Sequence, residues 1–149
     1  MTTKKATQPK KMKLSDFYFK QKHESGTKMP ILLPSGEDSG EWLQVRGPDC
    51  DESIKHGRAY TLAYRQVARD LEELETKCKE IEDFTEYNAV LSDRMIGLNI
   101  ELALGVVTGW SFDEEFSQES LLGLLDQYSG LADAVAKHHA ASRATLSAK

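Results

Sequence analysis

The chain of 149 residues contains only two cysteines and four prolines, and it lacks a long apolar run. Cys50 and Cys78 are too few for a disulfide framework, and on one helix they would lie about 40 Å apart, beyond disulfide reach. We therefore expect a reducing compartment. The longest nearly uncharged stretch, residues 95–112, contains Glu101 and is shorter than the roughly 20 apolar residues that cross a bilayer. We expect this stretch in a protein core, with no membrane association, and the N-terminus lacks the apolar segment of a secretory signal peptide.

The sequence motifs of common enzymes are also missing. The chain has no phosphate-binding glycine loop, Gly-x-Ser-x-Gly, His-Glu-x-x-His or Cys-x-x-Cys motif. His138 and His139 are adjacent, and adjacent helical residues point about 100° apart, so the pair does not predict a shared metal site. Glu101 is either a buried acid with a perturbed pKa or an exposed or arginine-paired residue, and the second interpretation is favoured. We expect no catalytic residue, no metal and no cofactor.

The net charge of −5 is unevenly distributed. Residues 1–22 contain seven lysines and one aspartate, whereas residues 23–149 contain 12 basic and 23 acidic side chains. Residues 1–13 hold almost nothing apolar to bury, which predicts a disordered basic arm. Lysines of this arm could make electrostatic contacts with an acidic partner, although nucleic acid is the less favoured partner. These possible contacts are Lys4, Lys5, Lys10, Lys11 and Lys13.

Two short extended segments follow the arm. Residues 29–34 are apolar and bounded by prolines, and residues 41–46 alternate in the period of a strand. Turn-forming residues fill positions 35–40 between them. We predict a β-hairpin at about 28–47, with Pro30 and Pro34 placing the first strand at a sheet edge.

A long helical region comes next, after a capping box formed by Asp49 and Glu52. Its apolar residues alternate in steps of four and three, which is the spacing of a heptad seam. An acid cluster and a second capping box at 83–86 predict a break near 82–85, where the chain folds back as an antiparallel helical hairpin. The seam residues are Tyr60, Tyr64, Val67, Leu71, Leu74, Cys78 and Ile81.

The second arm of the hairpin, residues 90–107, is apolar on nearly every face, which predicts a central helix. Gly109 is expected just past its C-cap, followed by a turn at 110–113 that carries Trp110 and Phe112. Ser117 and Ser129 are expected to cap two shorter helices. The predicted fold is mainly α: one domain over 14–146, with the N-terminal β-hairpin, the helical hairpin, two short C-terminal helices and a frayed tail at 147–149.

Four segments together carry a resemblance to a known family. They are residues 30–36 (PILLPSG), 42–49 (WLQVRGPD), 106–112 (VVTGWSF) and 124–135 (LLDQYSGLADAV), in this order around the long helix. The chain resembles the tail assembly chaperones of long-tailed bacteriophages over roughly residues 27–146. Members usually have a proline where this chain has Ser129, and the basic arm lies outside the family's pattern.

The resemblance implies a non-catalytic helical protein of the host cytoplasm. It would bind the tape-measure protein, assist assembly of the tail tube and its subunits, and be absent from the finished virion. Our hypothesis is a partner surface formed by Tyr60, Tyr64, Val67, Leu71 and Leu74 together with Trp110 and Phe112. The competing interpretation, slightly favoured, is that the seam packs on the domain's own second helix.

Other readings stay open at this point. The seam is long enough for self-association as a coiled coil. A structural head or tail component of the virion, or a nucleic-acid-associated phage protein that uses the arm, are the alternative functions.

Overall fold

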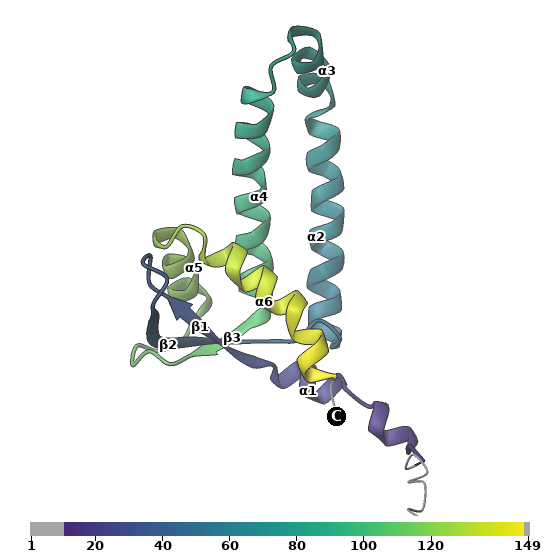
Figure 1. Cartoon of the computed structure of the whole chain (residues 1–149), viewed down its shortest axis with the longest axis vertical. Helices are drawn as coiled ribbons and strands as arrows, with labels where there is room; N and C mark the ends of the chain where they lie inside the picture. Colours follow the sequence, from purple (N-terminus) through teal and green to yellow (C-terminus); the bar gives the residue numbers. More distant parts are fainter. Residues whose placement is uncertain (1–10, 148–149) are drawn as a thin grey trace, which may run out of the picture.

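A computed structural model describes residues 11–147. Figure 1 shows a helical hairpin that projects from a base made of a small sheet and shorter helices. The elements are a 3-10 helix η1 (Leu14–Phe17), α1 (Lys20–Ser25), β1 (Thr27–Leu32), β2 (Asp38–Val45), α2 (Asp51–Asp70), α3 (Glu72–Ile81), α4 (Thr85–Val106), β3 (Val107–Trp110), α5 (Gln118–Gln127) and α6 (Leu131–Leu146). The mainly α fold predicted from the sequence is confirmed. Lys4, Lys5 and Lys10 of the predicted basic arm lie outside the described residues.

The predicted β-hairpin is present as β1 and β2, which pair antiparallel. β1 is an edge strand, as its prolines indicate, because the strand order is β1-β2-β3. Alternation along β2 places Leu43 and Val45 inside, both fully buried. The turn between the strands uses Gly36, whose φ of 92° lies in the left-handed region that favours glycine.

The third strand corrects our prediction for residues 107–113. We expected the helix to reach Val107 and Gly109 to follow its C-cap, but α4 ends at Val106 and Val107–Trp110 forms β3. Val107 pairs with Val45, and Trp110 pairs with Leu43. The valines at 106 and 107 and Thr108 favour a strand once a neighbouring edge is available, and β2 offers that edge. Trp110 therefore belongs to the sheet rather than to a free turn.

The turnaround predicted at 82–85 is confirmed. Glu82 adopts the left-handed conformation (φ 54°, ψ 35°) at the end of α3. The Asp83 carboxylate accepts hydrogen bonds from the backbone N–H of Thr85 (3.0 Å) and from its hydroxyl (2.6 Å). One interruption was not predicted: Leu71, with φ −98° and ψ 0°, separates α2 from α3.

Of the four predicted helix caps, only Ser117 is confirmed, since its hydroxyl accepts the backbone N–H of Ser120. The capping box predicted for Asp49 and Glu52 is wrong, because the N-cap of α2 is Cys50 and the Asp49 carboxylate binds Arg143 instead. The box at 83–86 is wrong because the N-cap is Phe84. The predicted cap at Ser129 is wrong because α6 begins after Gly130, whose φ is 88°. A tertiary ion pair replaces the cap at Asp49, a local contact with Thr85 occupies the Asp83 carboxylate, and a glycine turn replaces the cap at Ser129.

The hydrophobic core lies between the sheet and the helices α4, α5 and α6. We call the sheet, α5, α6 and residues 100–106 of α4 the base, and α2, α3 and residues 85–99 of α4 the hairpin. Ala103 and Val106 are fully buried in the base, as the prediction of a central helix requires. Within the hairpin, however, Ile96 is 52% exposed, at the rim of a small hollow that it shares with residues of α5 and α6.

Candidate functional site

The predicted heptad seam runs along the side of α2 and α3 that faces α4. Val67, Leu71 and Cys78 are buried. Tyr60 and Leu74 are half-buried, whereas Tyr64 and Ile81 are exposed. Because α2 packs along α4, the middle of the seam is already covered in the free chain. Its role in partner binding stays a prediction.

Trp110 is the last residue of β3 and Phe112 follows it, and β3 lies in the base, away from the middle of α2 (Figure 1). Their rings meet edge to face with centroids 5.3 Å apart, and Trp110 meets Phe116 in the same way at 5.1 Å. The Trp110 indole N–H donates to the Glu114 carbonyl at 2.8 Å. Both residues are half-buried against the core, so the structure does not join them with the seam in one surface.

The α6 side of the hairpin exposes apolar and aromatic side chains. Burial is the main reason why the pKa of Tyr60 on α2 is raised, and the charges of Tyr64 and Asp133 add to it. Ile96 of α4 and Asp133 of α6 line one small hollow. Tyr64 is 49% exposed and Ile96 is 52% exposed. We call Tyr60, Tyr64 and Ile96 the hairpin face.

The tip of the hairpin adds a further apolar group. Ile81 is 70% exposed and Phe84 is 37% exposed, and the Phe84 ring meets Tyr87 edge to face at 6.0 Å. For Ile96, the sequence signal was present in the apolar residues on every face of 90–107. A two-helix hairpin can bury only the facing sides of its helices, so the remaining apolar residues reach solvent.

A groove opens on another side, where α2, the loop before it and α6 come together. It has a volume of about 560 Å³. Sequence reasoning missed this groove, because its walls are separated by about 80 positions in the chain. The lining residues are Pro48, Asp49, Ser53, Ile54, Gly57, Arg58, Thr61, Leu62, Arg65, His139 and Arg143.

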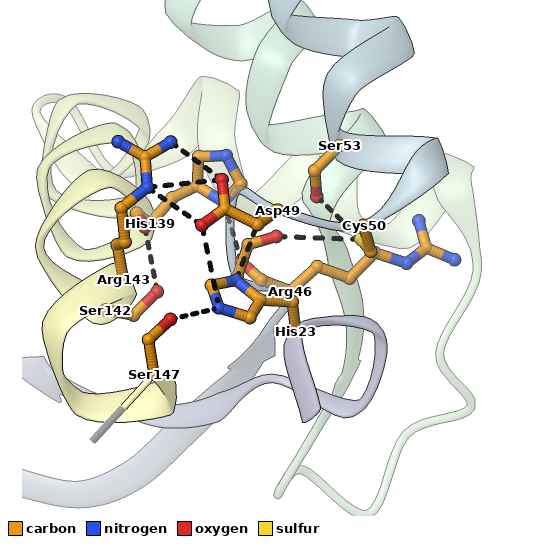
Figure 2. A network of polar contacts seen from close by, with 10 residues as sticks. His23, Arg46, Asp49, Cys50, Ser53, His139, Ser142, Arg143 and Ser147 are labelled. Carbon is orange, nitrogen blue, oxygen red and sulfur yellow. Dashed lines mark hydrogen bonds and ion pairs between the residues drawn. The ribbon is translucent and has the colours of Figure 1, made fainter. Parts of the chain in front are cut away.

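One wall of the groove is fixed by an ion pair, which Figure 2 shows. Arg143 on α6 contacts both carboxylate oxygens of Asp49, with Nε–Oδ2 and Nη2–Oδ1 distances of 2.9 Å. The guanidinium holds the pKa of the Asp49 carboxyl below its usual value, and the carboxylate raises that of Arg143. His139 donates from Nδ1 to the Arg46 carbonyl at 2.6 Å, and burial lowers its pKa. These contacts hold α6 against the loop before α2.

His23 of α1 lies behind this wall and is fully buried. Its Nδ1 accepts the backbone N–H of Asp49 at 3.0 Å, and its Nε2 contacts the Ser147 hydroxyl at 3.0 Å. An acceptor at Nδ1 requires the neutral ring with its proton on Nε2. Burial is the main reason why the pKa of His23 is lowered. The imidazole is thus a neutral link between α1, the loop before α2 and the C-cap of α6.

Reactive side chains in this region have structural partners. The Cys50 thiol donates to the Ser53 hydroxyl at 3.2 Å, and both residues are buried. His138 contacts the Thr27 hydroxyl at 2.7 Å and does not share a partner with His139. Glu101 is exposed. Among residues 11–147, the structure contains no cluster of three metal-ligating side chains, and no helix there is long and apolar enough to cross a membrane.

A helical hairpin that exposes apolar residues, mounted on a small α/β base, defines an interaction module. The family model for phage tail assembly chaperones matches residues 51–146, from the start of α2 to the end of α6. The chain belongs to this family. The match leaves out the β-hairpin, although we expected the resemblance to begin near residue 27. No curated protein and no solved structure gives a significant match.

Proposed function

We propose that this tail assembly chaperone binds the tape-measure protein through the hairpin face, without catalysis. The carrying observation is the exposure of Tyr64 and Ile96 on a hairpin that is only two helices thick. A third helix laid against this face would complete a small helical bundle and cover apolar area that water now contacts. The tape measure, which the family resemblance implies is long and helical, has the shape for this contact.

The remaining steps of the proposal follow from the family role. The chaperone acts in the host cytoplasm during assembly, helps tail-tube subunits to join and is absent from the finished particle. Mass spectrometry of purified virions tests the last step. Recovery of this chain in stoichiometric amounts would contradict it and favour a structural component of the tail.

The direct test is co-expression of the full chain with the tape-measure protein of the same genome. We expect more of the tape measure in the soluble fraction when the chaperone is present. Ile96→Asp should reduce this effect several-fold, because burying an unpaired carboxylate is costly. Leu122→Asp on α5 is the matched control, since Leu122 is 45% exposed but lies outside the hairpin. Equal solubility of the tape measure with and without the chain would refute the proposal.

A further inference from the structure

The side of α2 that faces away from the seam carries a stripe of arginine and apolar residues. Helical geometry of about 100° per residue places this stripe roughly 150° around the axis from the seam. Ile54 and Leu62 are 39% and 65% exposed. The stripe follows steps of four, four, three and four, and consists of Ile54, Arg58, Leu62, Arg65 and Arg69.

Among the described residues 11–147, the structure gives no ion pair and no hydrogen bond to the side chains of the three arginines of this stripe, Arg58, Arg65 and Arg69. By contrast, Arg94 pairs with Asp70 at 3.0 Å and Arg143 pairs with Asp49. Residues 23–149 carry an excess of acidic groups, yet along this helix face three exposed arginines lie together without an ion pair among the described residues.

The groove described above runs beside this stripe. Arg58, Leu62 and Arg65 form its α2 wall, and Arg143 and His139 form its α6 wall. Three arginines and one aspartate are the charged residues in its lining. The α6 wall is held in place by the Arg143–Asp49 and His139–Arg46 contacts, so the groove exists before any ligand arrives.

We propose that this groove docks an acidic amphipathic helix of a partner protein. Arg58 and Arg65 are seven residues apart, about 10.5 Å along the axis, which matches carboxylates seven residues apart on a helix that lies alongside α2. Leu62 lies between the two arginines and would pack against an apolar residue of that helix. The chain's own lysine-rich N-terminal segment has the wrong charge for this position. The docking site is distinct from the hairpin face.

The experiment uses the full chain and two short synthetic peptides that differ only in carrying glutamate or lysine beside a leucine stripe. Chemical-shift mapping should show the glutamate peptide on residues of the groove, with binding that weakens as salt increases. Arg65→Glu should weaken binding by roughly tenfold, since attraction becomes repulsion. Lys77→Glu on α3 is the charge-matched control and should change binding less than about twofold. Leu62→Ala should also weaken binding, with Leu122→Ala as its control.

Three results would overturn the inference. The two peptides could bind equally well, or the shifts could map to the hairpin face instead of the groove. Sedimentation of the chain alone could also reveal an oligomer that Arg65→Glu dissociates, in which case a second copy fills the groove. Because the peptides contain no tape-measure sequence, the outcome is independent of the co-expression test above.

Discussion

The base and the hairpin share α4 but bury its side chains to different extents. In the base, α4 is surrounded by the sheet, α5 and α6, and Ala103 and Val106 are fully buried. In the hairpin, the same helix has α2 and α3 as neighbours, and Ile96 remains 52% exposed. The comparison indicates that burial in the base supplies most of the stability, whereas the hairpin leaves apolar surface in contact with water.

The largest expected effect is a difference in the free energy of unfolding between two alanine variants, one of an aliphatic residue in the base and one of an aliphatic residue in the hairpin. Leu121 is fully buried, so Leu121→Ala should lower the free energy of unfolding by about 2–5 kcal/mol. Ile96→Ala should lower it by less than about 1 kcal/mol, because the side chain is already half in water. Urea unfolding followed by circular dichroism measures both. A similar loss for the two variants would mean that the hairpin face is covered in solution.

Two glycines on α4 allow a second comparison within one helix. A Cβ at Gly105, in the base, would lie 2.4 Å from the His56 ring, whereas a Cβ at Gly97, in the hairpin, would meet nothing within 4 Å. Gly105→Ala should therefore destabilise the fold by about 1–3 kcal/mol. Gly97→Ala should stabilise it by about 0.5–1 kcal/mol through helix propensity. Melting temperatures show whether each variant is stabilised or destabilised. A higher melting temperature for both variants would show that the His56 ring moves aside freely.

A smaller effect concerns the buried His23 of α1, which links α1 to the loop before α2 and to the end of α6. His23 has a pKa below the ordinary 6.5 because it is buried, so the unfolded chain binds more protons as the pH falls through 6.5. Stability should therefore decrease between about pH 7.5 and pH 5.5, above the range in which the Asp49 carboxyl titrates. Protonation would also place a hydrogen on Nδ1, facing the Asp49 N–H.

Urea midpoints at several pH values measure this dependence. His23→Gln should flatten the profile between pH 7.5 and pH 5.5. His56→Gln is the control, because the His56 side chain is 30% exposed and lies on α2. An unchanged slope in His23→Gln would assign the pH dependence to His138 or His139, whose pKa values burial also lowers.

Local sequence patterns were sufficient for the elements that depend on local chemistry. The β-hairpin follows from alternation and turn residues at 28–47, and the turnaround follows from the acid cluster near 82–85. The Ser117 cap needs only the N–H of Ser120. In contrast, β3 forms only because β2, whose residues 43–45 pair with residues 107–110, presents an open edge far earlier in the chain, and nothing within 107–110 reveals that edge.

For the candidate sites, too, the parts set by local spacing could be predicted and the parts set by distant residues could not. The seam could be identified from spacing alone, but its cover by α4 depends on how the hairpin closes. The capping box at Asp49 failed because Arg143, 94 residues later, takes the carboxylate. The groove needs that same pair for its second wall, so it could not be predicted from α2. The spacing of Arg58, Leu62 and Arg65 was visible in the sequence and was the available signal.

Because α4 continues directly into β3, a change in the tilt of α4 moves the tip of the hairpin relative to the sheet. α4 has 22 residues and is about 33 Å long, so a tilt of about 10° at its base displaces the tip by roughly 6 Å. The pivot is fastened by Arg46, whose backbone N–H donates to the Val106 carbonyl and whose guanidinium donates to the Gly105 carbonyl, both at 2.8 Å. A partner that pulls sideways on the tip therefore applies torque to the end of β2, and through the Arg46 carbonyl to His139 and α6.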